Sequence, residues 1–105
     1  MEDIFGKRLK ELREDKGLTM EMLAADMNYQ YGLKLNKGTI SRWESGATDP
    51  AISYVVKVAD YFDVSLDYCV GLTDSRLPAR LMAYARKFSE MQNQKEKSES
   101  ENSNK

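Results

Sequence analysis

Histidine is absent from the 105 residues of this chain, and cysteine occurs only once. Histidine is the commonest acid–base catalyst and the commonest metal ligand in proteins, so its absence counts against most catalytic and metal sites. A single cysteine, Cys69, can form neither an internal disulfide nor a structural zinc site. Because "DYCVG" embeds Cys69 among apolar neighbours, we expect a buried thiol rather than a reactive one. The composition therefore predicts a protein that is not an enzyme and that needs no metal or cofactor.

Long apolar runs and phosphate-binding glycine loops are missing as well. No stretch approaches the ~18–20 apolar residues of a membrane span, and the charged start "MEDIFGKRLKELRE" does not resemble a signal peptide. Gly32 and Gly38 do not have the spacing of a P-loop or a dinucleotide-binding loop. Carboxylate pairs such as Asp60 and Asp63 are typical of a solvated face. We therefore expect a cytoplasmic binding protein without a membrane partner.

Helical periodicity is the main pattern that is present. Apolar residues recur at intervals of three and four, which predicts an all-α fold of short amphipathic helices. The segment "AISYVVKVADYF" is rich in valine and tyrosine and would also suit a strand, but its spacing favours a helix. Thr19 and Ser65 are placed to cap helices. The residues expected to face the core in the first, second and fourth helices are Phe5, Leu9, Leu12, Leu23, Ala24, Met27, Tyr31, Val55, Val58, Ala59 and Phe62.

The stretch "LNKGTISRWESG" predicts a short third helix over Lys37–Ser45. Asn36 is a good N-cap for it, because its side chain can accept a hydrogen bond from the backbone N–H of Thr39. Gly46 supplies the left-handed residue that commonly ends a helix.

The two faces of this third helix differ in chemistry. Ile40 and Trp43 are three residues apart and are expected to point inward. The opposite face has no large apolar group and no carboxylate, and it comprises Lys37, Gly38, Ser41 and Arg42. Such a face suits close contact with a polar or anionic partner.

Residues 4–73 resemble the Cro/CI-type helix-turn-helix family of phage and bacterial repressors, also called the xenobiotic-response-element family. The matching segments are "RLKELREDKGLT", the "LA" of the second helix, "TISRWESG", Pro50 and "VADYFDVSLDYCVGL". The resemblance implies a five-helix, lambda-repressor-like DNA-binding domain at residues 1–74. In such a domain the third helix lies in the DNA major groove.

The resemblance and hydrogen-bonding chemistry together suggest which residues contact DNA. Lys37 and Arg42 can donate to guanine O6 and N7, and arginine can do so with two parallel bonds. Trp43 could instead stack on DNA, but the family places this position in the core. The residues expected to contact bases are Lys37, Gly38, Thr39, Ser41 and Arg42. The residues expected to contact phosphates are Thr19, Tyr31, Lys34, Asn36, Ser45 and Thr48.

The family also pairs an arginine of the first helix with the glutamate of the recognition helix. In this sequence the pair is Arg13 and Glu44, and we interpret it as a structural ion pair that ties the two helices together. Met20 departs from the family pattern, because glutamine usually stands there and contacts phosphate. One contact to the DNA backbone is therefore expected to be missing.

A second departure is the turn between the second and third helices, "YQYGLKLNK", which is several residues longer than usual. We expect the second helix to continue to Tyr31 and the chain to reverse at Gly32. Tyr31 and Lys34 would then reach phosphates near the third helix. Alternatively, Tyr29, Tyr31 and Leu33 simply pack over the lengthened turn.

Charge is unevenly distributed along the chain, whose net charge is −1. Residues 1–74 contain nine basic and thirteen acidic side chains, whereas the remainder contains seven and four. DNA affinity depends on neutralising phosphates, so an acidic domain predicts modest affinity per monomer and a need for dimerisation. Lys34, Lys37 and Arg42 nevertheless gather around the third helix.

Residues 75–92 predict an amphipathic C-terminal helix, with Pro78 in its first turn. Apolar residues spaced four, three, four and three apart form a heptad seam of Leu77, Leu81, Tyr84, Phe88 and Met91. This seam can pair with a second copy of the chain or fold back on its own domain, and we favour pairing. The polar tail, residues 93–105, is expected to be disordered.

Taken together, these patterns and the family resemblance predict a transcriptional regulator that binds double-stranded DNA in a sequence-specific way. The resemblance implies a repressor of phage or mobile-element type. It would recognise an operator as a homodimer through Lys37–Ser45, in the cytoplasm and associated with the nucleoid. The alternative is a protein-interaction module of the same fold, partnered with an antirepressor or toxin and binding DNA weakly. Met20 and the acidic balance favour that alternative, whereas the segment "NKGTISRWE" favours DNA.

Overall fold

The computed structural model describes residues 4–78, 80–81, 84 and 86–92. Its helices are α1 (Ile4–Asp15), α2 (Met20–Tyr31), α3 (Lys37–Ser45), α4 (Ile52–Phe62) and α5 (Leu66–Cys69). The described residues between 80 and 92 are helical as well, and none of the described residues is in a strand. The all-α class predicted from the sequence is confirmed, including a helix where "AISYVVKVADYF" left a strand conceivable.

The helix boundaries follow from local capping. Thr19, Asn36 and Ser65 precede α2, α3 and α5, and each side chain accepts a hydrogen bond from the backbone N–H three residues later, at 3.1, 2.9 and 2.9 Å. Gly32 and Gly46 end α2 and α3 with φ of 65° and 78°. Such left-handed angles cost glycine little and other residues more. These five predictions from the sequence are confirmed.

One buried core joins the five helices. It consists of Phe5, Leu9, Leu12, Leu23, Ala24, Met27, Ile40, Trp43, Val55, Val58, Ala59, Val64, Tyr68 and Cys69. Trp43 is only 5% exposed and its ring centroid lies 5.4 Å from that of Tyr54, which supports the core interpretation over stacking on DNA. Tyr31 and Phe62, predicted to face the core, are only partly buried. Both are the last residues of their helices, where a ring reaches the edge of the core.

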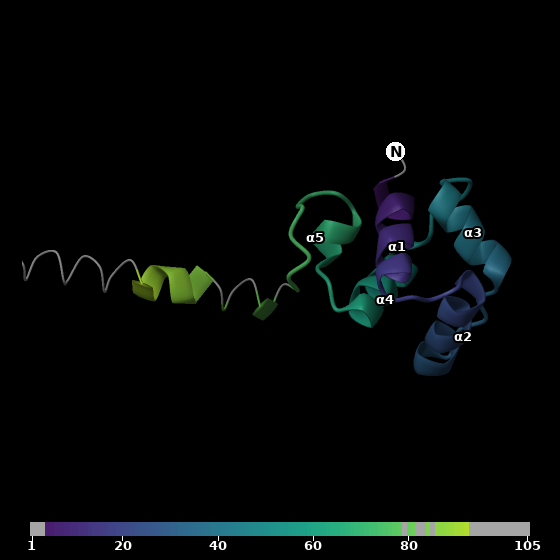
Figure 1. Cartoon of the computed structure of the whole chain (residues 1–105), viewed down its shortest axis with the longest axis horizontal. Coiled ribbons are helices and arrows are strands. Elements are labelled where there is room, and N and C mark those ends of the chain that lie inside the picture. The colour runs from purple at the N-terminus through teal and green to yellow at the C-terminus, as the bar shows by residue number, and fades with distance from the viewer. Residues whose placement is uncertain (1–3, 79, 82–83, 85, 93–105) are drawn as a thin grey trace, which may run out of the picture.

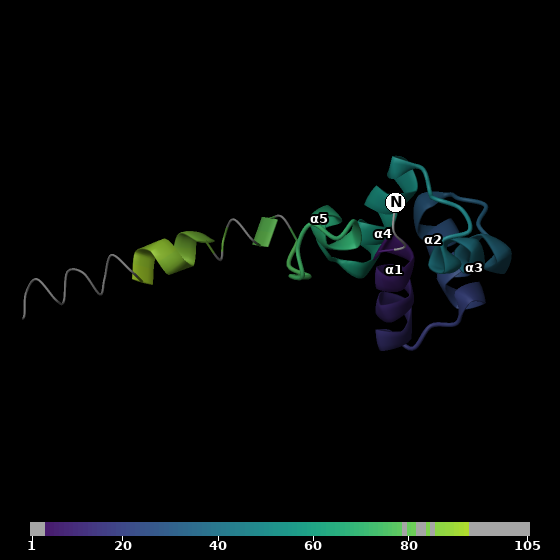
Figure 2. The same ribbon diagram turned by 90° about the horizontal axis from the view of Figure 1, so that it is seen from above.

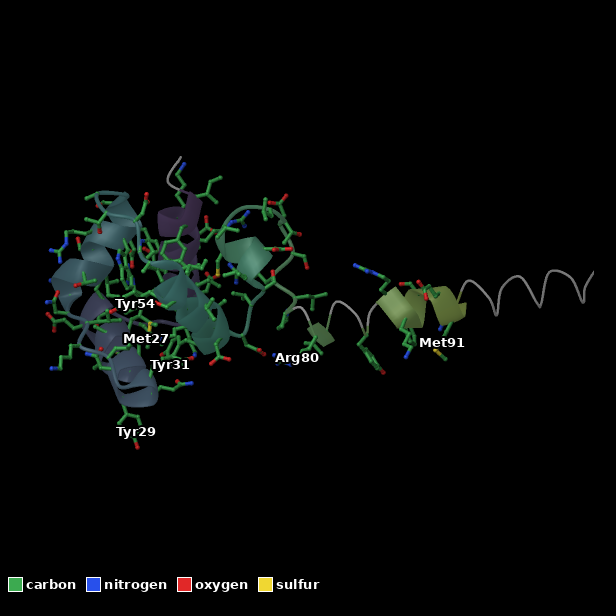
Figure 3. All side chains as sticks on the ribbon, turned by 180° about the vertical axis from the view of Figure 1, so that it is seen from behind. Met27, Tyr29, Tyr31, Tyr54, Arg80 and Met91 are labelled. Atoms are coloured by element: carbon green, nitrogen blue, oxygen red, sulfur yellow. The ribbon has the colours of Figure 1, made fainter. Side chains whose placement is uncertain are left out.

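Two tyrosine–aspartate hydrogen bonds hold α2 against α4. Tyr31 at the end of α2 donates its hydroxyl to Asp60 Oδ2 at 2.6 Å, and Tyr61 on α4 donates to Asp26 Oδ2 at 2.7 Å. Burial, aided by the bond to Asp26, raises the pKa of Tyr61 to about 12. Tyr31 lies between the two helices in Figure 3, whereas Tyr29 points away and is 95% exposed. Tyr31 and Leu33 therefore pack against the core, as the second alternative predicted, whereas Tyr29, which that alternative included, does not.

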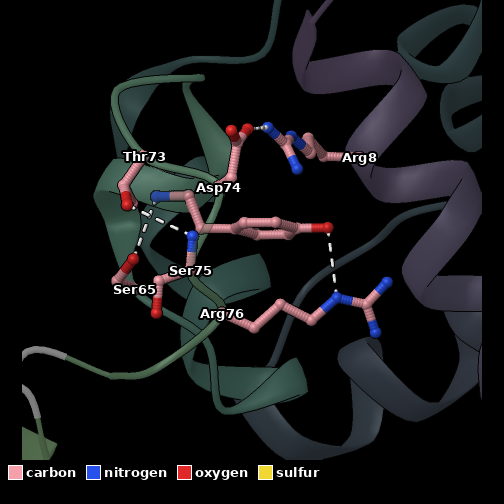
Figure 4. A network of polar contacts seen from close by, with 7 residues as sticks. Arg8, Ser65, Thr73, Asp74, Ser75 and Arg76 are labelled. Atoms are coloured by element: carbon pink, nitrogen blue, oxygen red, sulfur yellow. Dashed lines mark hydrogen bonds and ion pairs between the residues drawn. The ribbon is translucent and has the colours of Figure 1, made fainter.

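The described residues between 72 and 80 form a connector that is fixed to the five-helix body by arginines (Figure 4). The Arg8 guanidinium lies 4.1 Å from the centroid of the Tyr68 ring and pairs with Asp74 at 3.0 Å. Arg76 donates from Nε to the Tyr68 hydroxyl at 3.1 Å and pairs with Asp15 at 2.7 Å. These contacts fasten the start of the connector to α1 and α5.

The chain leaves the body after this connector. Arg80 pairs with Asp63 at 2.7 Å, and the described helical residues beyond it extend away from the body on the side opposite α2 and α3 (Figures 1 and 2). The predicted heptad seam is 41–70% exposed throughout, and it consists of Leu77, Leu81, Tyr84, Phe88 and Met91. None of its five side chains belongs to the buried core. The predicted disordered tail, residues 93–105, lies outside the described residues.

Candidate DNA-binding surface

Helix α3 buries one face and presents the other to solvent. Its inward residues are Ile40, Trp43 and Glu44. Its outward side chains are exposed at Lys37, Ser41, Arg42 and Ser45 and partly exposed at Gly38 and Thr39. Figures 1 and 2 show α2 and α3 side by side at one end of the molecule, so nothing else in the described part of the chain covers this face.

The buried charge on α3 is neutralised from α1. Arg13 donates from Nε and Nη2 to the two carboxylate oxygens of Glu44, at 2.7 and 2.9 Å. A third bond runs from Arg13 Nη1 to the carbonyl of Leu18 at 2.8 Å. The hydrogen bond to Glu44 raises the pKa of the Arg13 guanidinium. The ion pair expected from the sequence is thus present, and it fixes the position of α3 relative to α1.

The lengthened turn before α3 is fixed by Asn28, a residue that sequence reasoning missed. Its Nδ2 donates to the Leu35 carbonyl at 2.8 Å, and its Oδ1 accepts from the Leu35 N–H at 2.7 Å. Its backbone carbonyl accepts from the N–H groups of Gly32 and Leu33. The available signal was an asparagine in the last turn of a helix, where its side chain commonly bonds to nearby backbone.

The residues predicted to contact bases gather on the first turns of α3. The Thr39 hydroxyl donates to Asn36 Oδ1 at 3.2 Å, and Arg42 Nη2 approaches Thr39 Oγ1 at 3.4 Å. Side chains on a helix point toward its N-terminus, so Arg42 lies along the helix surface rather than away from it. The group brought together on this face is Lys37, Gly38, Thr39, Ser41 and Arg42.

Thr19, Lys34, Asn36, Ser45 and Thr48, predicted to contact phosphates, are all exposed. Ser45 Oγ already donates to the Arg42 carbonyl and accepts from the Ala47 N–H, so its hydroxyl is engaged at the end of α3. The sixth candidate, Tyr31, faces away from this group, because its hydroxyl is bonded to Asp60 on α4. The structure therefore does not bring Tyr31 to the surface formed by the others.

A shallow cavity of about 340 Å³ separates the start of α2 from the start of α3. Its lining combines polar, apolar and charged side chains, namely Arg13, Thr19, Met20, Glu21 and Lys37. Met20 also packs against the core and has no side-chain donor. The contact to a DNA phosphate that the family makes from this position is therefore unavailable here.

Several carboxylates that make the domain acidic lie away from α3 and are already hydrogen-bonded. Asp60 accepts from Tyr31, Asp63 pairs with Arg80, and Asp74 pairs with Arg8. Exposed charges farther apart than about 10 Å are largely screened at 0.1 M salt. The excess of acidic side chains in residues 1–74 is therefore expected to weaken DNA binding less than their number alone suggests.

The single thiol is buried, as predicted. Cys69 is completely inaccessible to solvent, and burial raises its pKa to about 11. A thiol with so high a pKa is scarcely ionised at neutral pH and is a poor nucleophile. In the described part of the chain, no helix is both long and apolar enough to cross a membrane.

Comparison with known proteins gives the same assignment as this geometry. The uncharacterised HTH-type transcriptional regulator YobD of Bacillus subtilis (strain 168) is 33% identical over 75 residues, which are 71% of this chain and 62% of YobD. The HTH-type transcriptional regulator ImmR of the same strain is 32% identical over 66 residues, which are 63% of this chain and 47% of ImmR. The match thus spans less than two thirds of each relative. No solved structure matches the chain.

The family match covers the part of the chain that forms the five helices. A family described as helix-turn-helix matches residues 9–69, from the middle of α1 to the end of α5. This range contains α2, the lengthened turn and α3, together with both partners of the Arg13–Glu44 pair. The chain therefore belongs to the helix-turn-helix family, in agreement with the Cro/CI-type resemblance of its sequence.

Proposed function

We propose that this chain is a transcriptional regulator that recognises a specific sequence of double-stranded DNA with the outward face of α3. Membership of the helix-turn-helix family implies a DNA-binding domain of this kind. The observation that carries the proposal is the arrangement of α3 itself. The Arg13–Glu44 pair holds its buried side in place, while Lys37 and Arg42 are exposed on the other side and pair with no carboxylate of the described residues.

In this proposal α3 enters the major groove with its N-terminal turns nearest the bases. Arg42 and Lys37 donate to guanine O6 and N7, and each good bidentate pair is worth about 1–3 kcal/mol of discrimination. Ser41 and Thr39 bond to base edges or phosphates. Phosphate contacts come from exposed side chains around α3, chiefly Thr19, Lys34, Asn36 and Thr48.

The regulator acts as a homodimer that pairs through the exposed seam of residues 77–91. Support comes from the exposure of its apolar side chains and from the connector, which holds the helical segment clear of α3. A dimer of this class contacts two half-sites about 34 Å apart, one turn of DNA. We place it in the cytoplasm at the nucleoid, as a repressor of phage or mobile-element type.

A second candidate function is a protein-interaction module of the same fold, bound to an antirepressor or toxin. One observation favours it. The cavity between the starts of α2 and α3 is lined by Met20 and Glu21, an apolar and an acidic side chain at a place where phosphate would approach. Such a surface would bind DNA weakly.

Selection from a random DNA duplex library at about 100 mM salt distinguishes the two functions, because non-specific binding is already weakened there. The wild-type protein should enrich a palindrome whose half-sites are one turn apart. The Lys37→Ala/Arg42→Ala variant should enrich nothing, although it folds.

The matched control is Lys7→Ala/Lys10→Ala, which removes the same charge from exposed positions of α1. This control should enrich the wild-type palindrome. A folded, dimeric wild-type protein that selects no sequence would contradict the proposal and favour the interaction module.

A further inference from the structure

The second residue of α3, Gly38, is covered by the side chain of another candidate base-contacting residue. Arg42 Nη1 and Asn36 Oδ1 each lie 3.2 Å from the point where a Cβ on Gly38 would stand, and Arg42 Cζ lies 3.9 Å from it. The guanidinium group therefore lies directly against the bare backbone at Gly38. A Cβ there would be in tight contact with both Arg42 Nη1 and Asn36 Oδ1 and would require them to shift by a few tenths of an ångström.

Few other contacts fix the position of the guanidinium group. Within the described part of the chain, the guanidinium donates a side-chain hydrogen bond only to Thr39 Oγ1, 3.4 Å from Nη2, which is long and weak. Other described arginines pair with carboxylates at 2.7–3.0 Å, namely Arg8, Arg13, Arg76 and Arg80. Arg42 has no such partner within the described residues, so its donors remain available to a base.

We propose that Gly38 is a specificity-determining position that acts through Arg42. The missing side chain lets the Arg42 guanidinium lie close to the first turn of α3, where recognition helices contact base edges. The Arg42 guanidinium then donates to O6 and N7 of one guanine in each half-site. This inference rests on the proposed function and adds to it a reason for glycine at a helical position whose backbone angles do not require it.

A methyl group at position 38 would displace Arg42 rather than Asn36. Asn36 Oδ1 caps α3 by accepting from the Thr39 N–H at 2.9 Å and the Thr39 hydroxyl at 3.2 Å. Losing such a cap costs about 1 kcal/mol. At 3.2 Å each neighbour must give way by only a few tenths of an ångström. The exposed end of the arginine moves more easily than the Asn36 side chain, which the two Thr39 bonds hold, so we expect the guanidinium to take up most of the shift and the cap to stay.

The backbone supplies no competing reason for glycine at this position. The glycines with positive φ are Gly17, Gly32, Gly46 and Gly71, and Gly38 is not among them. Within a helix alanine is favoured over glycine by up to about 1 kcal/mol. A stability role would make Gly38→Ala harmful to folding, whereas a role in DNA recognition makes it harmless to folding and harmful to base preference.

The test compares Gly38→Ala with the wild-type protein in thermal unfolding and in selection from a random duplex library. We expect Gly38→Ala to unfold at the same temperature or higher. Its preference for guanine at one half-site position should fall about tenfold, the size of one bidentate contact.

Arg42→Ala should lose the preference at the same position, and the Gly38→Ala/Arg42→Ala double variant should lose no more. Ser53→Ala, exposed in the first turn of α4, is the control and should keep the wild-type preference.

Each other result contradicts a different claim. If the wild-type protein selects a site and Gly38→Ala keeps the guanine preference, Gly38 does not act through Arg42. If Gly38→Ala unfolds at a lower temperature, glycine serves the fold instead. An added loss in the double variant would mean that the methyl group meets DNA directly. A wild-type protein that selects no sequence overturns the proposed function and this inference with it.

Discussion

At the scale of single residues, Glu44 shows how a recognition helix can carry a charge without presenting it to DNA. Its side chain is 4% exposed, and both carboxylate oxygens accept hydrogen bonds from Arg13, whose side chain is 11% exposed. A carboxylate facing the phosphates would repel them. Directed inward, the same carboxylate instead fixes α3 at the angle that exposes Lys37 and Arg42.

We expect Glu44→Leu to lower the free energy of unfolding by about 3 kcal/mol, because it leaves a partly buried arginine without its partner. The Arg13→Met/Glu44→Leu double variant should lose less, since no unpaired charge remains. Urea unfolding followed by circular dichroism measures both values. A double variant that is less stable than Glu44→Leu would show that the pair is not the source of the loss.

At the scale of elements, the turn between α2 and α3 determines how the recognition helix begins. Five residues separate the two helices, from Gly32 to Asn36. The two side-chain bonds from Asn28 to the backbone of Leu35 bridge this turn. The turn is therefore held at its start by the end of α2 and at its end by Asn28 and the cap of α3.

Replacing Asn28 by alanine should weaken DNA binding although Asn28 does not face the DNA. The variant loses two hydrogen bonds, so we expect the free energy of unfolding to fall by about 1–3 kcal/mol. Operator affinity should fall as well, because α3 is then less rigidly placed. Chemical unfolding and equilibrium binding to the selected duplex measure the two effects. Gln30→Ala, an exposed change in the same helix, should alter neither, and equal affinities for all three proteins would contradict a positioning role.

The limits of α3 could be predicted from the sequence because they depend on local chemistry. Asn36 caps through a residue three positions away, and Gly46 ends the helix through its own φ. Asn28 and Tyr31 could not be assigned in the same way. Their partners, Leu35 across the turn and Asp60 on α4, depend on how the chain reverses and packs.

The outward face of α3 could be predicted largely from periodicity, since inward apolar residues leave the polar residues outward. The position of the Arg42 guanidinium against Gly38 could not be predicted in this way. Sequence periodicity gives the side of the helix on which an arginine lies, but it does not give the direction of its long side chain along that helix.

At the scale of the whole molecule, the proposed DNA-binding face and the proposed pairing surface lie at opposite ends. α3 stands at one end of the body, and the exposed seam of residues 77–91 extends from the other (Figures 1 and 2). Three arginine–aspartate pairs fasten the connector between them, and they are formed by Arg8, Arg76 and Arg80. Dimerisation through the seam would therefore set the separation of two α3 helices.

We expect the Leu81→Glu/Phe88→Glu variant to be a folded monomer, because like charges replace apolar side chains at the pairing surface. The wild-type protein should sediment as a dimer at micromolar concentration. Analytical ultracentrifugation gives the masses, and Lys87→Glu, on the same helix but outside the seam, is the control. A wild-type monomer, or a dimer that both glutamates leave intact, would exclude the seam as the interface.

The central claim is that α3 recognises guanine in the major groove through Arg42. Dimethyl sulfate methylates guanine N7 in that groove, so protection from it on the selected operator reports the contact directly. We expect protected guanines in both half-sites, and in each half-site one of them should become reactive when Arg42→Ala is bound at saturating concentration. Guanines that stay fully reactive under bound wild-type protein, or a protection pattern that Arg42→Ala leaves unchanged, would contradict it.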